Sequence, residues 1–560
     1  MVISKKWGQG QIFAFSALDG KSCASDDFVG LLSGDRVGIK FFTKVRRELS
    51  IVNLQNVHPS FEAVTGDYIC IATADGEKMH IIYADTHLII GNTVSQCEAV
   101  VFTEGMYRPE YRGCVEIHNT DDGEYTALAR REGQFAFAYG KSSEEAAALA
   151  EKGLTLDMEA EAEKKLAIYK KYSLPQENPH AELYAKCISV MKTQLYSPEG
   201  NFKRIWSTPD RLPHRNLWLW DSVFHAVGHR NMDASLAENL ILAIFDVQKE
   251  DGFIPHMGAV DFISGITQPP VIAWGAYQVY RKSGNREFLR TVLENNKKFL
   301  LWCRTNRRDT EEELYTWLTQ EDKHCRCDES GMDNSPRFDV ESRLQAIDFS
   351  CFMANDVRYM KIIAQELGDK ENAAFFGDWY EEIKNAVNGK LWCKEEEFYY
   401  DYDILNDRFN KVQSVASFLP LFAGICSEDR AKALVAHLTN PETFYTEFPI
   451  PSISKKDKTF GSDMWRGPVW INYNYMIAKG LSEYGFSELS KELTDKTIEM
   501  LDMWYRRTGT IYEFYDCENR KAPSQINRKG EPFEPYDIAV RYQSIRDYGW
   551  SCTLLFDMLM

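Results

Sequence analysis

The hydrophobic pattern of this chain changes near residue 150, and that change limits its possible folds more than any other feature. Before it, short runs rich in β-branched and aromatic residues, such as RVGIKFFT and KMHIIYAD, alternate with turn signals such as ADGE and DDGE. From about residue 180 onward, apolar residues recur with the helical period in about twelve segments. In between, residues 142–171 are rich in Ala, Glu and Lys, which predicts a helix on the surface.

We therefore predict a mainly α protein in three parts. Residues 1–150 form an N-terminal β-sandwich domain, residues 151–179 a linker helix, and residues 180–560 a helical domain. The candidate helices fall in pairs, and loops rich in Trp, Gly and acidic residues separate the pairs. A ring of helix pairs with such loops at one end is an (α/α)6 toroid. An α-solenoid is the other all-helical possibility, but no repeat signature is visible.

The charge balance restricts the partners of this chain. Lys and Arg number 65 against 83 Asp and Glu, which gives a formal net charge of −18. Nucleic acids and anionic membranes would repel such a protein, so we expect neither as a partner. No apolar stretch reaches the ~18 residues of a membrane-spanning helix. The first residues, MVISKKWGQGQIFAF, lack the apolar core and cleavage site of a signal peptide, so we expect a cytoplasmic protein.

The cysteines give no sign of a disulfide framework or a metal site. The 13 Cys residues are scattered, and we interpret them as reduced thiols. Cys325 and Cys327 are the one closely spaced pair, but no second ligand pair follows at zinc-like spacing. We predict a loop that holds two thiols, with neither metal nor cofactor.

Aromatic residues make up 13% of the chain, and several of the 13 Trp lie in polar loops. In NLWLWD, Trp218 and Trp220 stand directly before Asp221. An indole face can stack on a sugar ring, and a carboxylate can accept hydrogen bonds from two neighbouring hydroxyls. Asp221 could equally cap the next helix, and both roles can hold together.

Two further loops supply acidic residues that could do chemistry. Asp333 lies in DESGMDNSPRFD, a long loop between predicted helices over 286–304 and 345–367, and long loops in compact domains are usually functional. Burial against aromatic rings would raise the pKa of Asp333 and fit it to act as a general acid, although a simple turn is the alternative. Glu513 lies among aromatic residues in TIYEFYD, where an exposed acid is the alternative. Paired carboxylates with sugar-stacking aromatics are what glycoside hydrolysis needs.

Other loops offer pocket walls. In DMWRGPVW, Trp465 and Trp470 can wall a pocket and Arg466 can bridge carboxylates, unless the segment is only a helix start packed on the core. Trp550, before the final apolar helix, can close the pocket floor. Gln248, in QKEDGFIP, is a weak candidate by itself because this loop reads equally as a plain helix exit.

Taken together, these segments resemble a known family. Residues 180–560 resemble the inverting α-glycosidases with an (α/α)6 barrel of glycoside hydrolase family 63. The motifs that carry the resemblance occur in the family's order: NLWLWDSVFHAVGHRNMD, NLILAIFDVQKEDGFIPH, DESGMDNSPRFD, DMWRGPVWINYNYMIAKGL, IYEFYDCENRK and DYGWSCTLLFDML. The family includes α-glucosidases and the mannosyl- and glucosylglycerate hydrolases. The family 37 trehalases share the barrel, but QKEDGFIP stands where a trehalase-like Gln-Trp-Asp-x-Pro stretch would be sought.

The resemblance implies a role for each motif. Asp333 is expected to be the general acid and Glu513 the general base that activates water, with no cofactor and with their carboxyl groups ~6.5–9.5 Å apart. The implied substrate-binding residues are Trp218, Trp220, Asp221, Gln248, Trp465, Arg466, Gly467, Trp470, Tyr512 and Trp550.

We therefore predict an inverting exo-acting α-glycosidase. Among the activities of this class, we favour an α-glucosidase that hydrolyses a small α-linked oligosaccharide or glucoside. A trehalase or a mannosyl- or glucosylglycerate hydrolase on the same barrel is the first alternative, and a non-catalytic carbohydrate-binding protein the second. The sugar, the linkage, the aglycone and the oligomeric state stay open.

Overall fold

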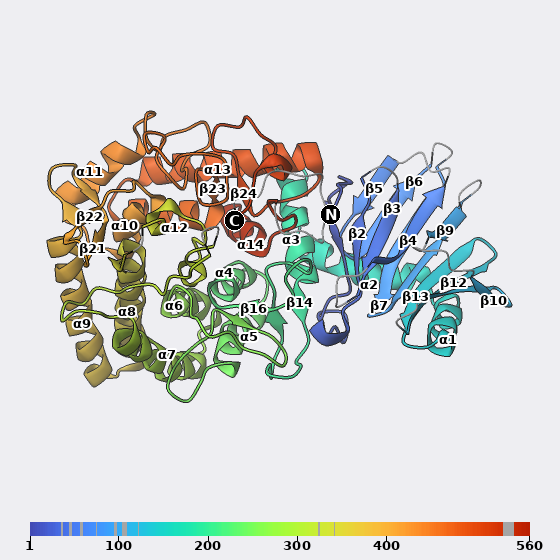
Figure 1. The fold of residues 1–560 in the computed structure, drawn as a ribbon. Coiled ribbons are helices and arrows are strands. Elements are labelled where there is room, and N and C mark those ends of the chain that lie inside the picture. Colours follow the sequence, from blue (N-terminus) through green and yellow to red (C-terminus); the bar gives the residue numbers. More distant parts are fainter. Residues whose placement is uncertain are drawn as a thin grey trace.

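A strand-rich part and a larger helical part make up the molecule (Figure 1). The computed structural model describes the chain except residues 35–36, 44–47, 56–59, 74–75, 95–97, 103–108, 121–122, 323–324, 341 and 530–542. The strands lie in the first 140 residues apart from short pairs, and the chain beyond them is mostly helical. The predicted change from strands to helices is confirmed.

Two antiparallel sheets form the N-terminal part. The smaller has the strand order β1-β2-β3-β4-β9 and the larger the order β10-β11-β12-β13-β8-β7-β6-β5. Their bounds are β1 (Ile12–Phe13), β2 (Val29–Leu32), β3 (Gly38–Phe42), β4 (Glu48–Gln55), β5 (Ser60–Val64), β6 (Tyr68–Ala72), β7 (Lys78–Asp85), β8 (Leu88–Asn92), β9 (Glu98–Phe102), β10 (Glu110–Arg112), β11 (Val115–Thr120), β12 (Glu124–Arg131) and β13 (Gln134–Gly140).

Strand β6 of the larger sheet is buried on both faces, which explains why its sequence is apolar throughout. Successive side chains of a strand point to opposite faces. Ile69 and Ile71 pack in a cluster that includes Phe41 of the smaller sheet. Tyr68 and Cys70, on the opposite face, belong to the main cluster that extends through the helical part. The two sheets therefore share one core, and the larger sheet also borders the helices.

Two helices, rather than the single predicted one, follow the sheets. They are α1 (Ser143–Gly153) and α2 (Met158–Tyr172). The chain breaks between them because Asp157 caps α2, where its carboxylate accepts hydrogen bonds from two backbone N–H groups of the first turn. Ala146 and Ala150 are buried, and α1 packs on β11, β12 and β13. The Ala-rich face of α1 is therefore a packing surface.

Twelve α-helices follow residue 180 in the described part of the chain. They are α3 (Ala181–Thr193), α4 (Leu219–His229), α5 (Ala234–Asp246), α6 (Ile272–Ser283), α7 (Arg286–Asn306), α8 (Ile347–Leu367), α9 (Lys370–Lys390), α10 (Leu419–Ala423), α11 (Glu428–Leu438), α12 (Ile471–Glu483), α13 (Ser487–Thr508) and α14 (Gly549–Met558). Short 3-10 turns lie at Asp328–Ser330 and Pro336–Phe338 in the loop between α7 and α8, and at Val415–Phe418 directly before α10.

Every second helix belongs to an inner ring. Contacts run from α4 to α6, α8, α10, α12 and α14 in turn, and α14 contacts α4, so the ring is closed. All residues of α4 are buried, and α14 is buried over Gly549–Phe556. The outer helices α7 and α13, by contrast, bury one side only. A helix that is apolar all round lies inside a protein, which agrees with this arrangement.

Short strand pairs hold the loops that precede the inner helices. β16 (Leu217–Trp218) pairs with β17 (Met257–Gly258) directly before α4. β23 (Val469–Trp470) pairs with β24 (Phe514–Tyr515) directly before α12. The other short strands are β14 (Leu195–Tyr196), β15 (Trp206–Ser207), β18 (Leu344–Gln345), β19 (Trp392–Cys393), β20 (Phe398–Tyr399), β21 (Asp401–Asp403) and β22 (Arg408–Asn410). These pairs fix loop positions at the amino ends of the inner helices.

The N-terminal segment also contacts this end of the helical part. The Ile12 N–H donates to Asp547 Oδ2 at 3.0 Å, and Asp547 Oδ1 accepts from the Thr510 hydroxyl at 2.8 Å. Lys186 of α3 completes the group with an ion pair of 2.8 Å. One buried carboxylate thus joins the first strand to the loop that leads to Glu513.

Across the described ranges, none of the helices combines the length and the apolar composition needed to cross a bilayer.

Candidate active site

A cavity of about 210 Å3 lies where the loops before α4, α12 and α14 meet. Its volume is somewhat below the ~300–1,000 Å3 of drug-sized pockets and suits a ligand of about one sugar ring. Seven of the twelve predicted site residues line it: Trp218, Trp220, Asp221, Asp333, Trp470, Glu513 and Trp550. The other lining residues are Pro209, His214, His256, Met257, Gln268, Asp328, Gly331, Met464, Arg528, Lys529 and Tyr548.

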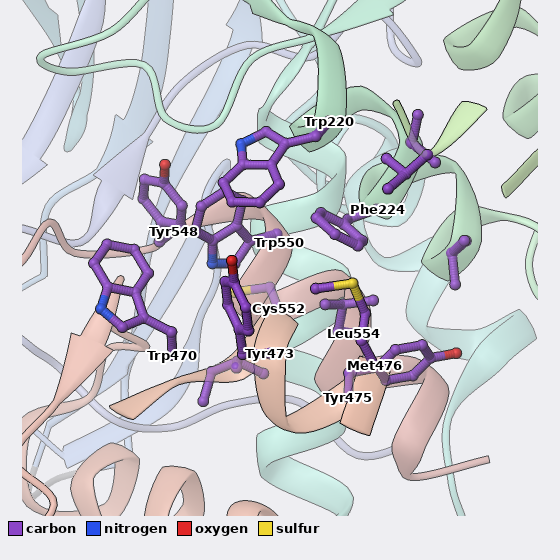
Figure 2. Packing of buried hydrophobic residues seen from close by; sticks show 14 of the residues in the cluster. Trp220, Phe224, Trp470, Tyr473, Tyr475, Met476, Tyr548, Trp550, Cys552 and Leu554 are labelled. Atoms are coloured by element: carbon purple, nitrogen blue, oxygen red, sulfur yellow. The ribbon is translucent and has the colours of Figure 1, made fainter. Parts of the chain in front are cut away.

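Aromatic rings grouped around Trp550 form one wall. The Trp550 ring centroid lies 5.0 Å from Tyr548, 5.2 Å from Trp220 and 5.8 Å from Trp470, each at a steep angle (Figure 2). Edge-to-face contacts of this kind favour aromatic pairs beyond simple burial and keep the rings in place. The wall is thus a rigid surface on which the C–H face of a sugar can stack.

Gly331 brings the acid-bearing loop against this wall. Its φ is +69°, a left-handed conformation, and a Cβ there would lie 2.3 Å from the Trp220 ring. Only glycine satisfies both conditions at low cost. The close approach places Asp333, two residues later, beside the tryptophan.

The Asp333 carboxyl group lies at the cavity with a cation beside it. Lys529 Nζ is 2.9 Å from Asp333 Oδ2, and the Asp333 side chain is 16% exposed. Burial raises the pKa of Asp333, while the Lys529 ammonium acts in the opposite direction. A carboxyl group with a raised pKa holds a proton at higher pH than an ordinary aspartate, as a general acid requires.

Two buried ion-pair groups hold the Asp333 loop. Glu329, which is fully buried, accepts two hydrogen bonds from Arg307 at 2.7 and 2.9 Å. Arg337 donates to both oxygens of Asp348 and both oxygens of Asp401, at 2.6–2.8 Å. The sequence prediction missed these anchors because their partners lie up to 64 residues away along the chain.

Glu513 lies at the cavity in a two-point pair with Arg528. Arg528 Nε is 3.1 Å from Oε2 and an Arg528 terminal nitrogen is 3.3 Å from Oε1. The Glu513 N–H donates to Ile545 O at 2.9 Å, and Glu513 is only 2% exposed. The alternative of an exposed acid is therefore wrong for Glu513. A guanidinium fork fixes the plane of a carboxylate, so the group has one orientation toward the cavity.

Asp221 is a third carboxyl group at the cavity. It lies within the first turn of α4, whose N-cap is Trp218. The Tyr548 hydroxyl donates to Asp221 Oδ1 at 3.4 Å. Burial raises the pKa of Asp221 well above its ordinary value, and the charge of Glu513 adds to the effect. Asp221 therefore lines the cavity while it also lies in the first turn of α4.

Five predicted residues do not line the cavity. Trp465 stacks on Trp470 with centroids 3.8 Å apart and planes 3° from parallel, so it supports the wall from behind. Gln248 donates its amide to Gly252 O and Asn295 O, both at 3.0 Å, and so holds its own loop.

The remaining three lie near the same loops. Arg466 forms an ion pair with Asp339. Gly467 has φ +131° and packs against Gly461. Tyr512 is buried beside Glu513, with Arg546 over its ring at 5.7 Å.

Sequence reasoning also missed residues that do line the cavity. Arg528 and Lys529 stand in QINRKGEP, an ordinary polar run without a motif. Gln268 accepts a hydrogen bond from the backbone N–H of Trp220 through its side-chain oxygen, at 3.3 Å. In the sequence it precedes two prolines, which indicate only a turn. Tyr548 was visible only as part of the segment DYGW.

Among the described residues, one group offers three close donors to a metal ion: Cys325, Asp328 and Asp333. Cys327, the other half of the closely spaced pair, points elsewhere and contacts Leu318 O at 3.8 Å.

Comparisons with known proteins agree with this geometry. The model of the mannosylglycerate hydrolase MGH1-like glycoside hydrolase domain matches residues 214–551. A mannosylglycerate hydrolase of Thermus thermophilus is 28% identical over 401 residues, covering 57% of this chain and 92% of the relative.

Two solved structures support the fold. The family 63 mannosylglycerate hydrolase of T. thermophilus, in complex with glucose, superposes with a TM-score of 0.55 at 24% identity, over 67% of this chain and 99% of the other. A bacterial glucoamylase in complex with acarbose superposes with a TM-score of 0.62 at 12% identity, over 100% and 96%. The second likeness includes the N-terminal sheets.

Proposed function

Since the chain belongs to the mannosylglycerate hydrolase MGH1-like glycoside hydrolases of family 63 and is therefore an O-glycosyl hydrolase, we propose that it is an inverting exo-α-glycosidase whose substrate carries an anionic aglycone. Mannosyl- or glucosylglycerate is the substrate class that fits best. The observation that carries the proposal is that Asp333 and Glu513 line one aromatic-walled cavity of about the size of a sugar ring.

The two acids take complementary parts in this mechanism. Asp333, whose pKa burial raises, donates its proton to the glycosidic oxygen as the bond to the aglycone breaks. Glu513 accepts a proton from a water molecule that attacks the opposite face of the sugar. Arg528 fixes the Glu513 carboxylate in the plane needed to orient that water. The mechanism requires ~6.5–9.5 Å between the two carboxyl groups, the space of one water molecule.

The sugar itself is expected to contact the aromatic wall and Asp221. Trp220, Trp470 and Trp550 offer C–H stacking, and Asp221 accepts hydrogen bonds from ring hydroxyls. A cavity of about the size of one ring supports exo action, because a chain that continued on both sides would not fit.

Charge around Asp333 supports an anionic aglycone. The leaving group departs on the side of the general acid, and the Lys529 ammonium lies 2.9 Å from that acid. Burial acts to lower the pKa of Lys529, but the charge of neighbouring Asp333 outweighs it and raises that pKa above its ordinary value. The Lys529 side chain therefore stays charged at neutral pH. A charge-assisted hydrogen bond from an ammonium to a carboxylate is the recognition that a glycerate group needs. This differs from the α-glucosidase prediction in the aglycone, not in the chemistry.

We further propose that the closed inner ring with its outer helices is an (α/α)6 toroid and that the two N-terminal sheets are a β-sandwich. The shared core of the sheets and the contacts from α4 round to α14 support this proposal. On this basis the proposed boundaries are 1–150 for the sandwich domain, 151–179 for the linker and 180–560 for the catalytic domain.

Proton NMR of the enzyme acting on a substrate panel tests the function. The panel contains mannosyl- and glucosylglycerate, kojibiose, nigerose, maltose, isomaltose and trehalose. We expect the glycerate conjugates to be cleaved fastest, with the β-anomer released first from an α-linkage. Release of the α-anomer first would refute the roles of Asp333 and Glu513. Preferential cleavage of a neutral disaccharide would refute the aglycone and favour an α-glucosidase or a trehalase. No cleavage of any member would favour a carbohydrate-binding protein.

A further inference from the structure

Three potential metal ligands converge on one cation beside the proposed active site. Lys529 Nζ lies 3.0 Å from Cys325 Sγ, 2.9 Å from Asp333 Oδ2 and 3.6 Å from Asp328 Oδ1. The three donor atoms lie within 4.8 Å of one another. Each donor therefore already faces a common point that a positive charge occupies.

The donor set selects for a particular kind of ion. Zn2+ takes Cys sulfur at about 2.3 Å and carboxylate oxygen at about 2.0–2.2 Å, in a tetrahedron that can keep one position for water. Mg2+ and Ca2+ prefer six or more oxygen ligands, and a thiolate is a poor ligand for either. One sulfur and two oxygens beside a solvent-accessible cavity thus match Zn2+ and not the hard cations.

The site is also sterically ready for exchange. Cys325 Sγ and Asp333 Oδ2 lie about 3 Å from the ammonium, so each moves by about 0.7–0.9 Å to reach a zinc distance. Asp328 Oδ1, at 3.6 Å, moves by about 1.5 Å. Lys529 is 29% exposed, and its flexible four-carbon stem can move the ammonium toward solvent. Exchange replaces one positive charge by two between the carboxylates of Asp328 and Asp333.

We propose that Zn2+ binds Cys325, Asp328 and Asp333 in place of the Lys529 ammonium and thereby inhibits the enzyme. In this step the Cys325 thiol loses its proton to solvent as the Zn–S bond forms, and Asp333 releases to solvent the proton that it holds as general acid as its Zn–O bond forms. A water molecule takes the fourth position. Asp333 then holds the metal and cannot carry a proton to the glycosidic oxygen. Binding stands by itself, whereas the inhibitory part rests on the proposed role of Asp333.

Calorimetric titration of the purified full-length protein with ZnCl2 tests binding directly. We expect one Zn2+ per chain, and MgCl2 should give no such signal. Cys325→Ser should weaken the affinity at least about 10–100-fold, because even outer-shell changes at zinc sites cost that much. Asp328→Asn should weaken it as well. Lys529→Met should strengthen it, because that variant removes the competing cation.

A matched control uses another thiol. Cys114 is exposed and belongs to the N-terminal part, so Cys114→Ser should leave zinc affinity unchanged. Equal loss in Cys114→Ser and Cys325→Ser, or no stoichiometric binding by the wild type, would overturn the proposal. Near-ultraviolet circular dichroism checks that each variant is folded. If Cys325→Ser is not folded, the other two variants still test the zinc site. The proposal expects Asp328→Asn to weaken zinc affinity and Lys529→Met to strengthen it.

Activity gives the second readout. ZnCl2 should inhibit the wild type reversibly, with full recovery on addition of EDTA, and should inhibit Cys325→Ser at least about 10-fold less strongly. Undiminished activity of the zinc-saturated wild type would overturn the inhibitory part. If no substrate of the panel is cleaved, the proposed function fails, and the calorimetric result still determines whether the zinc site exists.

Discussion

Substitution of Arg337 by methionine should destabilise the helical part strongly, and the buried ion pairs give the magnitude. Arg337, Asp348 and Asp401 are at most 2% exposed, and the guanidinium makes four hydrogen bonds to the two carboxylates. Removal of one member of such a group costs about 3–5 kcal/mol, because a buried charge is left without its partner. Here two carboxylates lose it together, so we expect the upper part of that range.

The expected change in melting temperature follows from the size of the unit that unfolds. Residues 180–560 unfolding together have an entropy of about 0.8 kcal/mol/K, at roughly 2.1 cal/mol/K per residue. A loss of 3–5 kcal/mol therefore lowers the melting temperature by about 4–6 °C. Because Arg337 follows Asp333 in the same loop, turnover at 20 °C should fall too.

Calorimetry and urea unfolding measure this effect, with two controls. Arg343→Met removes an exposed ion pair to Asp309 and should cost less than about 1 kcal/mol. The triple variant Arg337→Met, Asp348→Asn, Asp401→Asn removes the stranded charges and should recover more than half of the lost stability. A loss below about 1 kcal/mol in Arg337→Met, or no recovery in the triple variant, would refute the reasoning.

Three further predictions concern the site and its pH response. Asp333→Asn and Glu513→Gln should each lower kcat by at least about 100-fold with unchanged unfolding curves, and near-normal turnover in either would contradict its role. Lys529→Met should raise KM for mannosylglycerate about 10–100-fold, since a charge-assisted hydrogen bond contributes about 1.5–3 kcal/mol, but should spare KM for a neutral glycoside; equal changes for both would exclude aglycone recognition. Burial lowers the pKa of His225 to about 3, so the unfolded chain binds the extra proton between that value and about 6.5. As the pH is lowered through this window, stability should therefore fall by about 1.4 kcal/mol per pH unit from this group, and His225→Gln should show a correspondingly shallower slope in urea unfolding.

The sequence allowed prediction where function lies in short segments next to strongly patterned elements. Trp220, Trp470 and Trp550 stand at the starts of apolar helices, so their common location followed from the helical pattern. Asp333 could be found because Gly331 and the length of its loop mark an unusual backbone. In each case the local chain carried the signal.

Contacts between distant segments could not be read in the same way. Lys529 reaches Asp333 across 196 residues, and nothing in a polar run such as NRKG distinguishes a buried cation from a solvated one. Gln248 shows the opposite error, because it was predicted to bind the substrate but does not line the cavity. The motif around it matches the resemblance, yet its amide is bound to backbone carbonyls of Gly252 and Asn295. A motif gives the loop, but packing decides which of its side chains meets the ligand.

The closed inner ring has a consequence for how the chain is made. The ring closes only when α14 contacts α4, and about 330 residues separate the end of α4 from the end of α14. At about 5–20 residues per second, the ribosome needs roughly 16–65 s to make them. During that time the apolar face of α4 lacks its neighbour α14, and the ring stays open at this point. The nascent polypeptide therefore has a long interval in which it offers binding surfaces to chaperones, and its cavity forms at the end of that interval.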